Sequence, residues 1–103
     1  MRKVPALKHD CFLLDLTNGQ VTQLTSDDSD NRHPVWSPNG EWIAFVSNRD
    51  GREHLYVMRP DGSEVAQLTS GDSRETFPDW SSDNYIYFST DAGCPRFGKY
   101  LNI

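Results

Sequence analysis

The chain has 103 residues, of which 12% are aromatic and 24% charged, and its formal net charge is −5 at pH 7. This length allows one small domain, and the aromatic content excludes a disordered chain. The negative charge argues against a nucleic-acid-binding protein, and no apolar run approaches the length of a membrane span.

Residues 1–10 form a basic N-terminal extension without the apolar segment that a secretory signal contains. The two cysteines, Cys11 and Cys94, are too few for a disulfide framework, and isolated thiols fit a reducing compartment such as the cytoplasm. We therefore expect a cytoplasmic chain without a signal peptide, although a leader removed from the N-terminus would leave the same sequence.

Short runs rich in β-branched and aromatic residues follow, separated by turn dipeptides such as Asn18-Gly19 and Asp61-Gly62. No segment has a sustained helical period, so the predicted fold class is all-β. Trp42–Val46 and Leu55–Met58 are continuously apolar, which indicates strands covered on both faces. The predicted strands, in chain order, are Phe12–Leu16, Val21–Leu24, His33–Ser37, Trp42–Ser47, Leu55–Met58, Val65–Leu68, Phe77–Ser81, Tyr85–Ser89 and Lys99–Ile103.

An internal repeat with a period of 44 residues is the strongest feature of the sequence. Between Val21 and Ser37, ten of seventeen residues are identical to the residue 44 positions later, where chance would give roughly one match. A period of this length corresponds to one four-stranded propeller blade. We therefore divide the chain into the extension, two repeats over residues 11–91, and a tail over residues 92–103 that contains one strand of a third repeat.

The segment from Pro34 to Phe45, the following Ser47–Gly51 and the later Gln67-Leu68-Thr69 together resemble the signature repeat of TolB-like β-propellers. They are also similar to repeats in the propeller domains of prolyl-oligopeptidase-type and tricorn-type peptidases. The resemblance implies that the Pro-x-Trp-Ser strand is the innermost strand of each blade. The second unit departs from the pattern at Ser82-Asp83-Asn84, where the Pro and the Gly of the turn are missing.

By this mapping the chain holds an outer half-blade (12–24), a whole blade (33–68) and an inner half-blade (77–89). Two blades cannot close a propeller, because closed rings need about four to eight. We expect the inner half of one copy to pair with the outer half of the next, and the six blades of related proteins favour three copies over two or four. The tail strand would compete with a neighbour's Phe12–Leu16 for one place. The simpler alternative is a piece of a longer propeller.

The sequence carries no motif for catalysis or for metal binding. A nucleophile elbow requires Gly-x-Ser-x-Gly, and a zinc site requires closely spaced Cys or His pairs; both are missing. The acidic loop of Asp27, Asp28 and Asp30 lacks the glycine and the distal Glu of a calcium loop, so a solvated turn is the better interpretation. We expect no enzymatic activity, no metal and no cofactor.

Trp36 and Trp80 occupy the same repeat position, two residues after Pro34 and Pro78. A pair of tryptophans could form a ligand platform, but their repetition favours packing between blades, where aromatic side chains bury the largest areas. We therefore assign these four residues to the structural core of the repeat.

The best candidate for binding is the loop expected before each innermost strand, which should lie near the central opening of a propeller. Rigid scaffolds commonly display function on such loops, although drift at an exposed turn would also explain why the two units differ here. His33 would make the opening pH-sensitive if several copies converged there. The candidate residues are Asn31, Arg32 and His33 in one unit, and Glu75 and Thr76 in the other.

The expected function is a non-catalytic scaffold for protein–protein or small-ligand interaction, assembled from several copies. One alternative is a portion of a peptidase-associated propeller that gates access of substrate. Another is a carbohydrate- or metal-binding propeller. The fold is more strongly indicated than any of these functions, because the repeated residues serve the architecture of the blades.

Overall fold

The computed structural model describes residues 8–91 and the backbone of residues 97–99, and every regular element within them is a β-strand. No helix long and apolar enough to cross a membrane is found in these residues. Residues 20–90 contain no helix, which confirms the all-β prediction. The strands are β1 (Phe12–Leu14), β2 (Val21–Gln23), β3 (Asn31–Trp36), β4 (Ile43–Ser47), β5 (His54–Met58), β6 (Ala66–Gln67), β7 (Glu75–Trp80), β8 (Tyr85–Thr90) and β9 (Phe97–Lys99).

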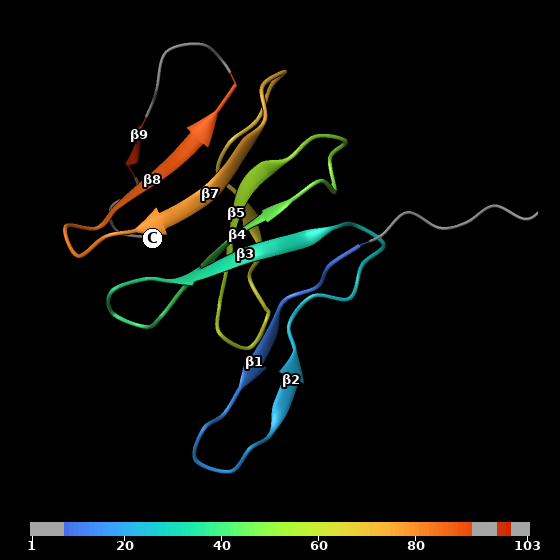
Figure 1. Ribbon diagram of the computed structural model, residues 1–103, viewed down its shortest axis with the longest axis vertical. Helices are drawn as coiled ribbons and strands as arrows, with labels where there is room; N and C mark the ends of the chain where they lie inside the picture. The colour runs from blue at the N-terminus through green and yellow to red at the C-terminus, as the bar shows by residue number, and fades with distance from the viewer. Residues whose placement is uncertain (1–7, 92–96, 100–103) are drawn as a thin grey trace, which may run out of the picture.

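The strands form three antiparallel sheets with the orders β1-β2, β3-β4-β5-β6 and β7-β8-β9. In Figure 1 the β1–β2 hairpin projects from one side of the middle sheet, and the third sheet lies on the other side. The arrangement matches the expected half-blade, whole blade and half-blade, with β9 added to the last. The tail strand was predicted at Lys99–Ile103, but β9 begins at Phe97 and residues 100–103 lie outside the described residues.

The two central strands of the middle sheet form the core of the molecule because both of their faces are covered. Every residue of β4 and β5 is buried, as their continuous apolar sequences predict. One face packs against Trp80 and Ile86 of the third sheet, and the other packs against Cys11 and Leu24 beside the first hairpin. The face towards the third sheet consists of Ala44, Val46, Leu55 and Val57, and the face towards the first hairpin consists of Ile43, Phe45, Tyr56 and Met58.

The repeated Gln-Leu-Thr segment has the same structural role in both units. The hydroxyl of Thr25 accepts a hydrogen bond from the backbone N–H of Cys11 at 2.9 Å, and Thr69 accepts one from Leu55 at the same distance. The amide of the preceding glutamine donates to the threonine carbonyl in each case. These bonds hold the outermost strand of each blade beside its neighbour, which explains why the segment is repeated.

The turn between β5 and β6 locks the middle sheet against the first hairpin. Gly62 in this turn has a φ of 86°, which favours glycine, and a Cβ added there would lie 2.8 Å from the carbonyl oxygen of Leu24. Gly40 has a similar φ of 74° but no atom within 4 Å of such a Cβ. Of these two glycines, therefore, Gly62 alone is required both by the φ of its turn and by the close approach of another backbone segment.

The innermost strands begin two residues earlier than predicted. β3 starts at Asn31 and β7 at Glu75, so the prediction that these residues lie in loops is wrong. Asn31 and Arg32 already pair with Ser47 and Val46 of β4, and the ladder then continues past an irregularity. The sequence did not predict a strand at these positions because their residues are polar, and the partners of these residues come from distant parts of the chain.

Candidate interaction surfaces

The two innermost strands carry the same backbone irregularity at the same repeat position. The register shifts between Arg32 and Val35 in β3, and between Thr76 and Asp79 in β7. Within these bulges His33 and Phe77 have positive φ values of 57° and 54°. Such values are uncommon for residues other than glycine, and their recurrence 44 residues apart marks a built feature of the blade.

The bulges bring two aromatic rings together on neighbouring blades. The ring centroids of His33 and Phe77 lie 4.8 Å apart with an interplanar angle of 52°. Phe77 is 63% exposed, although a phenylalanine is usually buried. The innermost strands therefore present an exposed aromatic pair at the side that would face the opening of a propeller.

Arg32 lies beside this pair and is held by two acidic residues. Its guanidinium lies 2.8 Å from a carboxylate oxygen of Glu53 and 3.2 Å from one of Asp30, and the side chain is half-buried. Burial raises the pKa of the Asp30 carboxyl, but hydrogen bonds from His9 and the charge of Arg32 outweigh this effect, so the pKa lies below its ordinary value. Arg32 thus combines a fixed position with access to solvent.

Thr76 occupies the corresponding place in the other unit and lines a shallow depression of about 260 Å³. The volume is below the range of roughly 300–1,000 Å³ that is usual for ligand pockets. The depression is lined by Arg74, Thr76, Ser89, Thr90 and Asp91.

Asn31 is fully buried where the first hairpin meets the middle sheet. Its amide nitrogen donates to Asp27 at 2.8 Å and lies 3.3 Å from Asp10, and its amide oxygen accepts from Arg49 at 2.9 Å. Arg49 also pairs with Asp27 and lies over the rings of Phe45 and Tyr56. The Asn31 side chain therefore connects two sheets and is not presented at the surface.

Glu75, the repeat equivalent of Asn31, is buried where the middle and third sheets meet. Its carboxylate accepts hydrogen bonds from the hydroxyls of Ser73 and Thr90 at 2.6 and 2.8 Å, and it lies 3.9 Å from Nε2 of the buried His54. The His54 ring nitrogens face a carboxylate oxygen of Asp50 at 3.3 Å and the Ser73 carbonyl at 2.9 Å.

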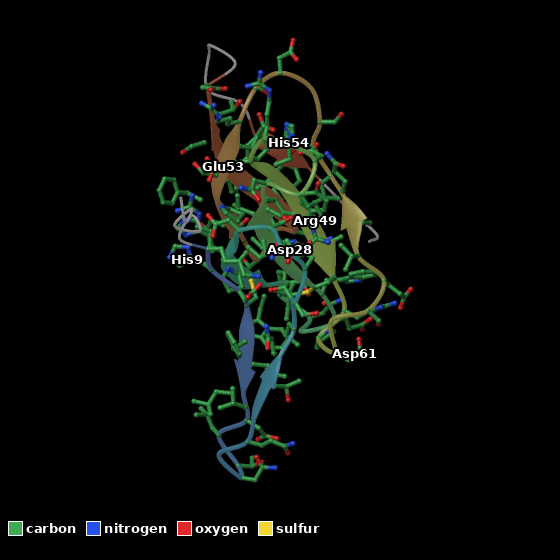
Figure 2. All side chains as sticks on the ribbon, turned by 90° about the vertical axis from the view of Figure 1, so that its right-hand side faces the viewer. His9, Asp28, Arg49, Glu53, His54 and Asp61 are labelled. Carbon is green, nitrogen blue, oxygen red and sulfur yellow. The ribbon has the colours of Figure 1, made fainter. Side chains whose placement is uncertain are left out.

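Figure 2 shows His54 and Arg49 among the packed strands, whereas Asp61 lies at the rim of the molecule. Sequence reasoning missed the contact between His54 and Glu75, because the two residues are separated in the chain and share no motif. No group of three or more potential metal-ligating side chains occurs in residues 8–91.

The Cys11 thiol is buried at the entrance to β1. Burial and the charge of Asp10 raise its pKa to about 11, although the charge of Arg49 acts in the opposite direction. Thiols react as thiolates, so this cysteine should be chemically inert in the folded chain. Cys94, the other cysteine identified in the sequence, lies outside the described residues.

A second surface lies on β3, where the two units differ sharply in burial. Trp80 and Pro78 of β7 are buried, and Trp80 packs against the middle sheet. Trp36 is 48% exposed and Pro34 is also exposed. The prediction that these two residues belong to the core is therefore wrong for this chain. The physical reason is that the β1–β2 hairpin covers only the outer part of this face of the middle sheet. The side chains of β3 on the same face therefore stay exposed to solvent.

The bare face has an apolar counterpart on the first hairpin. Several large hydrophobic side chains of β1 and of the rest of its hairpin are exposed. Exposed apolar clusters of this kind usually mark an interaction site. The residues are Phe12 and Leu14 of β1 and Val21 of β2, whereas Leu16 is exposed in the turn beyond the end of β1.

Comparison with known proteins relates the whole of this architecture to one family. The family model described as a TolB beta propeller domain matches residues 6–98. A solved structure described as a candidate TolB from Agrobacterium tumefaciens has a TM-score of 0.76 and 33% identity, and the match covers 82% of this chain and 31% of that one.

Two curated relatives are also similar to this chain. A protein of Agrobacterium fabrum described as uncharacterized is 35% identical over 85 residues, which is 81% of this chain and 29% of the relative. The Tol-Pal system protein TolB of Wolbachia pipientis is 36% identical over 55 residues, which is 52% of this chain and 13% of that protein. The chain thus spans less than a third of the length of each of these relatives.

Proposed function

This chain belongs to the TolB β-propeller family, and on that premise we propose that it is a non-catalytic interaction scaffold assembled from several copies. Its uncovered blade faces bind blades of further copies, and its innermost strands then surround a common opening. Activities of the longer relatives are not needed for this role, since it depends only on the surfaces of the two blades.

The observation that carries the proposal is the difference between two equivalent tryptophans. Trp80 is 8% exposed because the neighbouring blade covers it. Trp36 is 48% exposed because, in the described residues, the blade beside it consists of the outer strands β1 and β2 and has no inner strands to cover it. A second copy supplies such strands as β7 and β8. Covering Trp36 and Pro34 would give the middle blade the same packing on this face as the third sheet already has.

Closure sets the number of copies. Each copy contributes about two blades, and rings of roughly four to eight blades are known, so two, three or four copies fit. A head-to-tail contact that repeats by rotation closes into a ring. We favour three copies, because this gives the six blades expected for propellers that resemble this one.

The innermost strands provide the surface for a ligand. In the proposed ring, each copy places His33, Phe77 and Arg32 near the opening, and combines aromatic contact with positive charge. A partner protein or a small molecule with an apolar group and an acidic group would fit this combination. Asn31 and Glu75 hold the blades together beneath this surface.

Light scattering on matched variants tests the proposal. Trp36→Ser should shift the chain towards the mass of a single copy and leave its β-type circular dichroism unchanged, because the side chain lies at the surface of the isolated chain. Phe77→Ser is the control, since Phe77 is also exposed but faces the opening. Equal assembly of Trp36→Ser and the parent would refute the role of the bare face.

A further inference from the structure

The proposed assembly joins the edge of β1 in one copy to the edge of β8 in the next, and only one of these two edges is unpaired in the described part of the single chain. In the described part of the chain, β1 pairs with β2 alone, so its other edge is free. The corresponding edge of β8 is occupied by β9, with Ile86 opposite Gly98 and Tyr87 opposite Phe97. An incoming β1 and the chain's own β9 therefore require the same place.

The internal repeat gives the register that β1 would adopt beside β8. In the middle sheet, Ile43 lies opposite Met58 and Phe45 lies opposite Tyr56. The repeat equates β1 with β5, because Tyr56 and Met58 lie 44 residues after Phe12 and Leu14. It equates Ile43 with Ile86 and Phe45 with Phe88, because the second unit lacks one turn residue and Ile43 pairs with Trp36 as Ile86 pairs with Trp80. Leu14 of a second copy would consequently lie opposite Ile86, and its Phe12 would lie opposite Phe88.

This register would bury the side chains that the first hairpin leaves exposed. Ile86 and Phe88 pack towards the middle sheet, and residues directly opposite one another project to the same face of an antiparallel pair. Phe12 and Leu14, each 55% exposed in the isolated chain, would thus enter an apolar layer. β9 offers less at this position, because Gly98 has no side chain to place opposite Ile86.

We propose that β9 is an internal competitor for the assembly edge, and that β1 of a second copy replaces it beside β8. The inference rests on the proposed function, since it specifies how the copies join. The single chain protects its own sheet edge with β9, a common need of exposed strands. At sufficient concentration the exchange provides two apolar cross-strand pairs that β9 lacks.

A reversible lock on β9 tests the exchange directly. Tyr87→Cys and Phe97→Cys place two thiols opposite one another in the β8–β9 ladder, where a disulfide would hold β9 in place. Cys94→Ser prevents mispairing, and the buried Cys11 is left unchanged. Sedimentation velocity should show single chains when the variant is oxidised, and assembly as in its Cys94→Ser parent after reduction.

A second pair of variants avoids any change in the third sheet. Leu14→Ser should weaken self-association by roughly tenfold or more, since an apolar side chain that becomes buried on pairing is lost. Leu16→Ser is the matched control, because Leu16 is 87% exposed and lies beyond the end of β1. Its self-association should equal that of the parent.

The outcomes separate this inference from the proposed function. Assembly of the oxidised, locked variant as tight as that of its reduced form would overturn the exchange and leave the scaffold role intact. A chain that stays single even after deletion of residues 92–103, with its β-type circular dichroism retained, would overturn both. Equal weakening by Leu14→Ser and Leu16→Ser would also contradict the register.

Discussion

Replacing Trp80 and Trp36 by alanine, one at a time, tests how coverage determines the stability of each blade. The two residues have the same type and the same repeat position, but Trp80 is 8% exposed and Trp36 is 48% exposed. Truncation of a buried tryptophan typically costs about 3–5 kcal/mol of unfolding free energy, which includes the cavity that remains. Trp80→Ala should fall in this range, because its ring packs on the middle sheet.

Trp36→Ala should cost less, about 1–2 kcal/mol, since roughly half of the ring is already in contact with water and no closed cavity forms. For a small domain with a total stability of about 5–15 kcal/mol, the difference between the variants is easily measured. Urea unfolding followed by circular dichroism provides the free energies, at a dilution where the parent is a single chain. An equal loss in both variants, or a larger loss for Trp36→Ala, would refute the reasoning.

Three further predictions concern turns, thiols and acid. Gly62→Ala should destabilise the chain more than Gly40→Ala in thermal unfolding, because both replacements strain a positive φ but only the first meets a neighbouring backbone; equal shifts in Tm would contradict this packing. In a Cys94→Ser background, Cys11 should react with iodoacetamide at pH 8 about a hundredfold more slowly than in urea, given its pKa of about 11; fast native labelling would disprove its burial. The pKa of Asp30 is lowered in the folded chain, so its carboxylate stabilises the fold at any pH above the ordinary pKa of 3.8, and this contribution is lost as the pH falls through the folded pKa. Asp30→Asn should therefore be less stable than the parent at neutral pH and equally stable in strong acid. A deficit in Asp30→Asn that persisted in strong acid would contradict this.

Much of the fold could be predicted, because the repeat and the apolar pattern reflect contacts between strands of the same blade, which are close in sequence. The continuous apolar residues of β4 and β5 indicate burial on both faces, and the structure confirms it. The identical Thr25 and Thr69 make identical hydrogen bonds to the next strand. Such features follow from short segments whose neighbours are set by the blade itself.

Other features could not be predicted because they depend on what covers each segment. Trp36 and Trp80 are indistinguishable in the sequence, and only the presence of a neighbouring blade makes one buried. The positive φ at His33 could not be predicted, because the residue at this position is not a glycine. Asn31 and Glu75 lie at the expected repeat position, but their partners come from loops distant in the chain, so their burial had no sequence signal.

The native mass of the chain in solution tests the central claim most directly. Sedimentation equilibrium should give a mass that rises with concentration from 11.8 kDa to a discrete plateau, with roughly three times that mass favoured by a six-bladed ring. A mass of 11.8 kDa at every concentration, with the fold intact, would contradict the claim that the bare blade faces join several copies.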